Sequence, residues 1–307
     1  MDPQHLSHGG RGHLRALFVL TPPESKRFIA RAVARLPEVE AARDEGEIAI
    51  GHGGTNVYVA EEILGECPDR DKFLSGLVIN RILCVTQAEE KPPMLVLRNG
   101  VRVAPAATME ETLRDFGARS VFIKGANAVD ADRNVGVFVA NPAGGTIGWS
   151  YGLLSARGCR LIVAVGLEKL IPSVRDAARS CGQDTLYYCQ GIRIGMIPIM
   201  NATVVTEIEA FDILFGLRAV HIGGGGAGDS QGAVVVVAEG EKDRLDQAIA
   251  LIESIKGEAA LHPRKSLCVN CLPTVLVTTD EGVRRETKYC MYQGTPEEEL
   301  PPFVRQL

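Results

Sequence analysis

Residues 47–64, "EIAIGHGGTNVYVAEEIL", have the composition and spacing of a ligand-binding turn. An apolar strand leads through three glycines and a threonine straight into an amphipathic helix. Glycine adopts positive φ without strain and lets a ligand approach the backbone closely. The free N–H groups at a helix start suit a phosphate or a carboxylate. The expected ligand-binding residues of this turn are Gly51, Gly53, Gly54, Thr55 and Asn56, with Lys26 on the preceding helix as a charge partner.

The same stretch also has a purely structural interpretation. The third glycine of the G-x-G-x-x-G pattern is absent, and the chain has no G-x-x-x-x-G-K-[ST] motif. A plain corner between a strand and a helix is therefore the alternative to an anion site at this turn.

Further polar residues follow the next predicted strand, in "SVFIKGANAVD" (residues 120–130). Ligands of open α/β sheets bind at the carboxyl ends of the strands, although a solvated loop lysine is the alternative for Lys124. The additional expected ligand-binding residues are Lys124, Gly125, Asn127 and Asp130, together with a second glycine turn at Gly144, Gly145 and Thr146. A third glycine-rich run, "HIGGGGAGDSQGAVVVV", joins two strands and predicts a hairpin.

The chain contains eight cysteines and shows no export signal, which favours reduced thiols over disulfides. Cys268 and Cys271 form a C-x-x-C pair, and Cys290 follows. A structural zinc site needs four ligands, and His262 is the expected fourth, giving a Cys3His set. A redox pair and plain thiols are the alternatives. The other five cysteines are scattered along the chain.

Strands alternate with helices through the first two thirds of the chain, which predicts parallel β-α-β units buried on both sheet faces. We assign residues 14–200 to this α/β domain. Residues 201–282 read strand, helix, strand, strand, helix, with a further strand near "TVLVTT", the pattern of a ferredoxin-like α+β domain. Residues 283–307 are rich in proline and glutamate and predict a loosely held C-terminal tail.

The overall composition is that of a globular protein. The net charge is −5 and the isoelectric point about 5.8, whereas general nucleic-acid and anionic-membrane binders present a basic face. No apolar run has the length that crosses a bilayer. We therefore expect a cytoplasmic homo-oligomer that binds neither nucleic acid nor membrane.

Two stretches carry a resemblance to a known superfamily. The turn at residues 51–55 resembles the G-x-G-[ST]-T turn of ribose-5-phosphate isomerase and its relatives, the glucosamine-6-phosphate deaminases and the CoA-transferases. Residues 120–172 are similar to the isomerase segment that follows Asp-Gly-Ala-Asp, and to the "GANA" segment of lactate-utilisation (LUD) proteins. The resemblance implies a Rossmann-like three-layer isomerase/CoA-transferase-like domain, followed here by the smaller ferredoxin-like domain.

Departures from the isomerase pattern exclude the isomerase reaction. Lys124 and Asn127 replace the two carboxylates, and Pro142 replaces the lysine before the second glycine turn. The helix expected to carry the general-base glutamate, "TIGWSYGLL", has none. Proton abstraction beside a carbonyl needs a base within hydrogen-bond reach. Asp130 and Asp132 are the nearby carboxylates that remain.

Two hypotheses follow from these residues. In the first, the chain binds a small anionic metabolite bearing a phosphate, a nucleotide or CoA, and the reaction is undefined. In the second, the same turns sense a metabolite without catalysis, and the ferredoxin-like domain mediates oligomerisation. Zinc at the C-terminal cysteines is the one cofactor that the sequence indicates.

Overall fold

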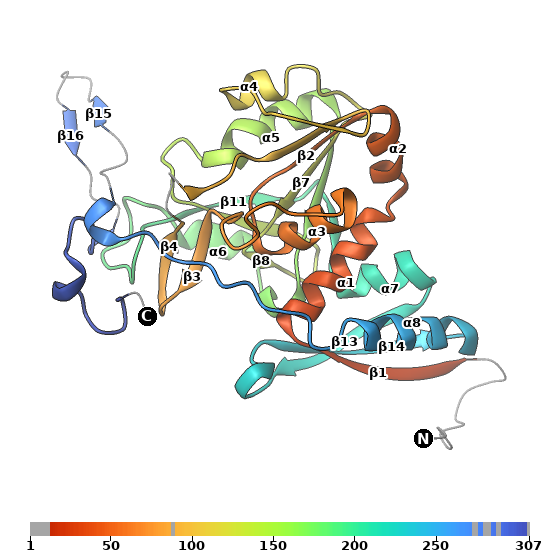
Figure 1. The fold of residues 1–307 in the computed structure, drawn as a ribbon. Coiled ribbons are helices and arrows are strands. Elements are labelled where there is room, and N and C mark those ends of the chain that lie inside the picture. The colour runs from red at the N-terminus through yellow and green to blue at the C-terminus, as the bar shows by residue number, and fades with distance from the viewer. Residues whose placement is uncertain (1–12, 87–89, 272–275, 279–283, 287–289, 306–307) are drawn as a thin grey trace.

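A six-stranded mixed sheet forms the centre of the molecule, in the order β12-β10-β7-β2-β5-β6 (Figure 1). The computed structural model describes residues 13–86, 90–271, 276–278, 284–286 and 290–305. β12, β10, β7 and β2 run parallel, and β5 and β6 add an antiparallel hairpin at one edge, with its turn at Asn99-Gly100. These strands are β2 (Glu47–Ile50), β5 (Leu95–Arg98), β6 (Val101–Val103), β7 (Val121–Gly125), β10 (Arg160–Ala164) and β12 (Thr203–Val205). The predicted α/β class is confirmed.

Alternate side chains of the central strands enter two different cores. Ile48 and Ile50 of β2 belong to the larger core, whereas Ala49 between them belongs to the second. In β7, Ile123 belongs to the larger core and Phe122 to the second. Successive strand side chains point to opposite faces, so a strand that is apolar throughout is buried on both sides.

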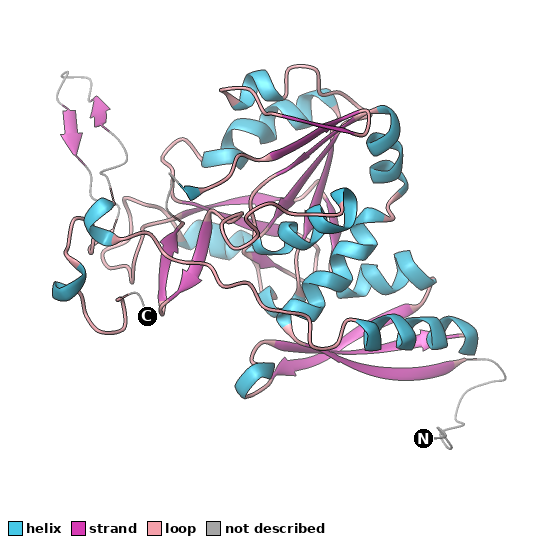
Figure 2. Ribbon diagram, viewed as in Figure 1, coloured by secondary structure: helices cyan, strands magenta, loops and turns pink. Residues whose placement is uncertain are grey.

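Helices cover both faces of the central sheet (Figure 2). α1 (Pro22–Ala34), α3 (Gly54–Leu64) and α7 (Glu207–Phe215) bury apolar side chains in the larger core, and α5 (Gly145–Arg157) does so in the second. The remaining helices are α2 (Pro37–Glu45), α4 (Met109–Thr112), α6 (Val174–Ser180) and α8 (Lys242–Ser254).

A second sheet is antiparallel and has the order β1-β14-β13. Its strands are β1 (Leu14–Leu20), β13 (Arg218–Gly225) and β14 (Ala233–Gly240), and the glycine-rich run forms the predicted hairpin between the last two. Leu245, Ala248 and Ile252 of α8 are buried in the larger core, beside β1 and β14.

The strand membership of this second sheet corrects the sequence-based assignment. Leu14–Leu20 was assigned to the α/β domain, but it pairs with β14 along its whole length. β12 was assigned to the ferredoxin-like unit, but it pairs with β10 in the central sheet. The strand near "TVLVTT", β15 (Leu276–Thr278), pairs with β16 (Arg284–Glu286) instead of joining β13 and β14. Hydrophobic pattern does not indicate which strands pair with one another.

The remaining strands lie beside the C-terminal segment. β3 (Gly76–Ile79) and β4 (Ile82–Val85) form a hairpin, and β8 (Ala128–Val129), β9 (Val135–Val139) and β11 (Gly195–Ile199) form a small sheet. Contrary to the expected loose tail, Tyr292, Leu300 and Val304 are buried against Ile82 of β4.

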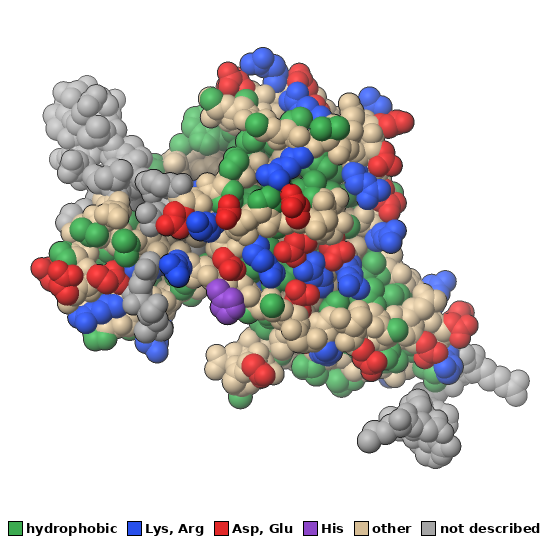
Figure 3. All heavy atoms as spheres, viewed as in Figure 1, with side chains coloured by type: hydrophobic (Ala, Val, Ile, Leu, Met, Phe, Trp, Pro, Cys, Tyr) green, Lys and Arg blue, Asp and Glu red, His purple; other side chains and the backbone are tan. Residues whose placement is uncertain are grey.

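The surface agrees with the composition. Acidic and basic side chains intermingle across the face shown in Figure 3. Among the helices of the described residues, none combines the length and the apolar character needed to cross a bilayer.

Arg27 of α1 joins three segments through their carboxylates. Its guanidinium lies 2.5 Å from Glu61, 2.9 Å from Glu62 and 3.0 Å from Glu258. It also lies over the Tyr58 ring, 4.9 Å from the centroid. Burial opposes the charge of Arg27, but the three carboxylates outweigh it and raise the pKa of the guanidinium. This network fixes α1 against α3 and the chain after α8.

We expect the Arg27→Ala variant to lose about 2–4 kcal/mol of unfolding free energy, because it leaves three partly buried carboxylates without their cation. Arg31→Ala is the matched control, since Arg31 is 34% exposed and lies 3.7 Å from Glu62. Its loss should stay below about 1 kcal/mol. Urea denaturation of both variants measures the difference. Equal losses would show that the Arg27 network adds nothing beyond a surface ion pair.

Candidate functional site

Ionisable side chains lie at the carboxyl ends of all four parallel strands. His52 follows β2, Lys124 lies at the end of β7, Glu168 and Lys169 follow β10, and Glu207 follows β12. Parallel strands end at the same edge of a sheet, where ligands of such sheets bind. With neighbouring residues of α1, of α3 and of the chain before β5, they make up a set that we call the strand-end cluster. Its members are Ser25, Lys26, His52, Thr55, Asn56, Lys91, Lys124, Glu168, Lys169 and Glu207.

Lys124 occupies the middle of the strand-end cluster. Its side chain crosses Gly51, where a Cβ atom would lie 3.1 Å from Lys124 Cδ. Its Nζ donates to the carbonyl oxygen of His52 at 3.3 Å. Burial, and then the charges of Lys169 and Lys91, lower the pKa of Lys124 to about 8. This amine therefore loses its charge within the pH range that is accessible to experiment.

The other lysines of the cluster lie close enough to repel one another. Burial, and then the charge of Lys169, lower the pKa of Lys26, and Glu168 opposes that effect. Lys169 Nζ donates to the carbonyl oxygen of Ala126 at 3.1 Å and lies 3.8 Å from Glu168. Burial also lowers the pKa of Lys91. The cluster contains more lysines than carboxylates, so its field favours an anion.

His52 does not add to this positive charge. Burial lowers its pKa to about 4, helped by the charges of Lys91 and Lys124 and opposed by the hydrogen bond to Pro92. The ring lies against Phe73, with centroids 4.7 Å apart, and its Nε2 is 2.7 Å from the Pro92 carbonyl oxygen. His52 is therefore neutral at physiological pH and positions the chain before β5.

Several buried polar atoms of the cluster have no hydrogen-bond partner among the residues that the structure describes. They are Thr55 Oγ1, Asn56 Oδ1 and Glu168 Oε2, whereas Ser25 and Glu207 form a hydrogen bond with each other. Buried polar atoms in folded proteins are almost always paired with protein, water or ligand. The atoms come from different elements but gather at the same sheet edge. A polar ligand at this edge would form hydrogen bonds with them.

The glycine turn differs in detail from the sequence-based expectation. Gly51, Gly53 and Gly54 are not among the glycines with positive φ, so conformational freedom does not explain them. The N–H groups of Gly51 and Gly53 donate to Ile123 and Phe73. The amides of Gly54, Thr55 and Asn56, in the first turn of α3, are those that helix geometry leaves for an anion.

Asn56 fixes this turn from inside. Its Nδ2 donates to the carbonyl oxygen of Gly51 at 2.7 Å and to that of Ile123 at 3.4 Å. These bonds tie the start of α3 to the ends of β2 and β7. Lys26 is also close, because a Cβ atom on Gly54 would lie 3.9 Å from Lys26 Cε. The predicted residues Lys26, Gly51, Gly54, Asn56 and Lys124 therefore lie together.

Other predicted ligand-binding residues have structural roles. Gly125 is the last residue of β7. Asn127 Oδ1 accepts from the Phe138 N–H at 3.0 Å. Asp130 accepts four hydrogen bonds from Asp132, Asn134 and Val174, and these outweigh burial and lower its pKa. A carboxylate held in this way has no lone pair directed at a substrate proton.

The second glycine turn starts a helix on the opposite face of the central sheet from α1 and α3. Gly144 and Gly145 have φ of 84° and 58°, a region that favours glycine. A Cβ atom on Gly144 would lie 2.9 Å from the Gly148 backbone. Thr146 accepts from Ser150 Oγ within α5. These contacts account for the turn structurally.

The predicted metal ligands divide between two places. Cys268, Cys271 and Cys290 lie near β4, whereas the N–H of exposed His262 donates to Asp71 at 2.8 Å. Among the described residues, no three His, Cys, Asp or Glu side chains are arranged to hold a metal ion. These side chains are therefore not arranged as a Cys3His set in this structure.

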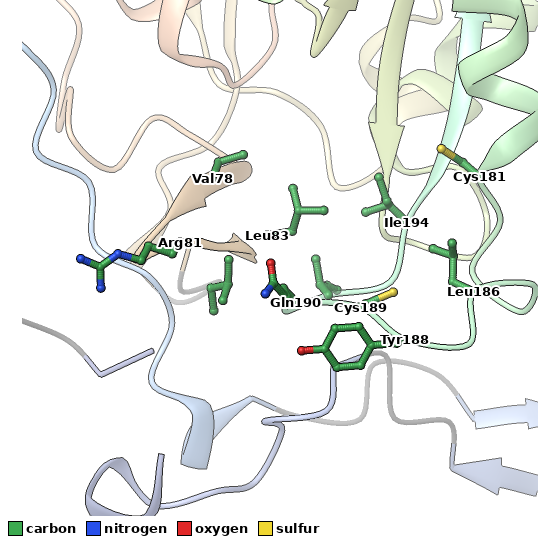
Figure 4. Close-up of a pocket in the computed structure, with 11 residues that line it drawn as sticks. Val78, Arg81, Leu83, Cys181, Leu186, Tyr188, Cys189, Gln190 and Ile194 are labelled. Carbon is green, nitrogen blue, oxygen red and sulfur yellow. The ribbon is translucent and has the colours of Figure 1, made fainter. Parts of the chain in front are cut away.

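An apolar hollow of about 430 Å³ lies beside β4 (Figure 4). Val78, Leu83, Leu186, Ile192 and Ile194 supply most of its wall. The hollow contains none of the residues predicted to bind ligand. Its lining suits an apolar group better than an anion, so it is a separate feature from the strand-end cluster.

Sequence analysis missed Ser25, Lys91, Glu168, Lys169 and Glu207. A usable signal existed for the last three, because each follows directly after an apolar strand that reads as parallel. The polar residues after "RLIVAVG" and "ATVV" belong to the same sheet edge as Lys124. Ser25 and Lys91 reach the cluster from elements whose position the sequence did not indicate.

Comparison with protein-family models, with curated proteins and with solved structures finds no match to this chain.

The protonation state of Glu207 predicts how the stability of the protein depends on pH. Burial, and then the charge of Glu168, raise its pKa to about 7 from the ordinary value of 4.5. The folded protein therefore keeps a proton that the unfolded chain releases, and stability falls as pH rises between these values. We expect Glu207→Gln to match the wild type at pH 4 and to exceed its stability by up to about 3 kcal/mol at pH 8.

Urea denaturation across this pH range measures the effect. The glutamine carbonyl can still accept from the Leu167 N–H, which donates to Glu207 at 2.9 Å. Glu253→Gln on the exposed face of α8 is the control and should leave the pH profile unchanged. A Glu207→Gln profile parallel to that of the wild type would mean that Glu207 is ionised in the folded protein.

Proposed function

We propose that this protein binds a small anionic metabolite, bearing a phosphate, a nucleotide or CoA, at the strand-end cluster. The observation that supports this most is the gathering of Lys26, Lys91, Lys124 and Lys169 at one sheet edge, with lowered pKa values for three of them. Like charges in a partly desolvated site destabilise one another. An anion between them removes that repulsion.

The surrounding groups determine which anions fit. The first-turn amides of α3 and the amines of Lys26 and Lys124 would hold a phosphate or a carboxylate. Glu168 has a buried oxygen, and Thr55 and Asn56 each have another, without a partner among the described residues. Such acceptors suit hydroxyl or amino groups on the same ligand. A metabolite with an anionic end and a polar body therefore satisfies more of the cluster than inorganic phosphate does.

The resemblance to the isomerase and CoA-transferase superfamily supports the same location, because the resembling turn supplies Gly51–Asn56. It does not supply a reaction. The carboxylates that the isomerase uses are replaced by Lys124 and Asn127, and Asp130 is held by backbone N–H groups. We therefore propose a binding site whose chemistry is undefined, in a fold of the Rossmann-like three-layer type.

A ligand panel with one cluster variant tests the proposal. Ribose 5-phosphate, ADP, CoA and inorganic phosphate are titrated by calorimetry at pH 7. We expect Lys124→Met to weaken the tightest of them about 10- to 100-fold, the value of one charge-assisted hydrogen bond. Without ligand the same variant should be at least as stable as the wild type, because a repelling charge is removed. Lys242→Met, an exposed lysine on α8, is the control.

The pH dependence and the turn provide further tests of the same site. Affinity should fall as pH rises above about 8, where Lys124 loses its proton, and Lys124→Met should not show this fall. Gly54→Leu should abolish binding, since the new side chain meets Lys26 and Leu261. The proposal fails if no panel member binds, or if Lys124→Met binds as the wild type does.

Turnover assays separate an enzyme from a sensor. Ribose 5-phosphate should not be converted to ribulose 5-phosphate above background, because Lys124 and Asn127 replace the carboxylates of the isomerase pattern and Asp130 is held by four hydrogen bonds. Conversion that is lost in the Asp132→Ala variant would contradict this expectation. Any other product formed from a bound panel member would identify the reaction.

The exposed face of the second sheet supports the alternative function, a non-catalytic sensing module that forms oligomers. Leu17, Val19, Val220 and Ile222 are 60%, 43%, 43% and 54% exposed on β1 and β13. Leu17 and Val220 flank Val237 in register. The charges at one end of this face, Arg15, Glu239 and Arg218, already pair with one another. We infer that a second copy docks here, since a two-fold contact places the apolar strip of one copy against that of the other and leaves these charges at one end.

We expect the wild type to be a dimer and Leu17→Glu to be a monomer, because the carboxylate would be buried without a partner in the interface. Analytical ultracentrifugation at micromolar concentration measures the mass. Val101→Glu is the control, since Val101 is 64% exposed on β6 and lies in the other sheet. A monomeric wild type, or a dimer that survives Leu17→Glu, would contradict the inference.

A further inference from the structure

Cysteines from three distant parts of the chain surround one small core. Cys268 is buried in it, and Cys84 of β4 and Cys290 pack against it. Cys271 lies one turn beyond Cys268, and its N–H donates to the Cys268 carbonyl oxygen at 3.2 Å. We call Cys84, Cys268, Cys271 and Cys290 the cysteine group. Sequence analysis placed Cys84 among the scattered thiols, because nothing in the sequence connects β4 with the C-terminal segment.

Backbone hydrogen bonds fix these segments around Cys84. Ser266 N–H donates to the Val85 carbonyl oxygen at 3.0 Å, directly after Cys84. Ile192 N–H donates to the Leu83 carbonyl oxygen at 2.9 Å, directly before it, and Ile192 also forms a bridge with Cys290. Gly294 N–H closes the ring by donating to the Cys268 carbonyl oxygen at 2.7 Å. The main chain therefore positions all three segments.

The side chains of the group lie near one another. Cys268, Cys271 and Cys290 all lie within electrostatic range of Cys84. Lys265 is almost fully buried, 3.8 Å from Cys268 Sγ, and pairs with Glu297 at 3.5 Å. Four cysteine thiolates are a common ligand set of structural zinc sites.

We propose that Cys84, Cys268, Cys271 and Cys290 bind one zinc ion and thereby fix the C-terminal segment to β4. Each thiol releases its proton on binding, and four thiolates around Zn²⁺ leave a net charge of about −2. Lys265 offsets part of it. No three of the described side chains are arranged as ligands in this structure, so binding includes a local adjustment of the cysteine rotamers. Cys84 takes the position that sequence analysis gave to His262.

Cobalt substitution tests the ligand set. The reduced, chelator-stripped full chain is titrated with Co²⁺, whose thiolate charge-transfer absorption grows with the number of sulfur ligands, and then with Zn²⁺. We expect one ion per chain and displacement of cobalt by zinc. Cys84→Ser and Cys268→Ser should each weaken binding at least 10-fold and lower the charge-transfer absorption. His262→Ala should leave both unchanged.

Two cysteines outside the group provide matched controls. Cys189 lines the neighbouring apolar hollow, and Cys159 packs against the second core. Serine at either position should leave the metal content and the spectrum unchanged. Failure of the wild type to bind either ion, or loss of the cobalt spectrum in His262→Ala but not in Cys84→Ser, would overturn the proposal.

X-ray absorption of the zinc-loaded wild type covers the case in which Cys84→Ser does not fold. Four sulfur scatterers at about 2.3 Å support the proposal. Three sulfurs with one nitrogen would overturn it and restore the Cys3His set. This readout is independent of metabolite binding, so it stands or falls separately from the proposed function.

Discussion

The lysines at the carboxyl ends of the parallel strands repel one another, and the elements around them must hold them in place against that repulsion. The sheet directs Lys124 and Lys169 to one edge, and α1 adds Lys26 to it. Glu168 and Glu207 reduce this repulsion but do not remove it, since Glu207 itself has a raised pKa. A fold selected for stability alone would not bury these groups together. Their presence together is the observation on which the proposed binding site rests.

Keeping these charges together lowers the stability of the fold, and the apolar packing of its two cores compensates for that loss. α1, α3 and α7 are held to the central sheet by large apolar side chains such as Phe28, Tyr58 and Phe211. Arg27 then links α1, α3 and the chain after α8 through partly buried ion pairs. Rigid elements are needed at this place, because an amine can only be kept near other amines if its backbone cannot move away.

Local sequence pattern predicted much of the fold and part of the site. The apolar run that contains Phe122 indicates a strand buried on both faces, and the glycine-rich run after His221 indicates a hairpin. Strand partners did not follow, because β1 and β14 are more than 200 residues apart and periodicity carries no information about pairing. For the same reason Lys124 was identified and Lys91 was not. Cys84 was missed because its partners come from the other end of the chain.

The segment between α8 and Cys268 connects the two candidate sites physically. It starts where Lys256 and Gly257 contact Glu24 at the start of α1. Figure 1 shows it running from α8 toward β4. Along the way Tyr58 Oη donates to the carbonyl oxygen of residue 259 at 2.9 Å, and Leu261 lies beside Gly54. The same segment therefore contacts the start of α3 and, through the hydrogen bond from Ser266, also β4. We call this segment, between α8 and Cys268, the strap. The strap packs against the glycine turn before α3 at one end and enters the cysteine group at the other, so order in the C-terminal segment and order in that turn share the same contacts.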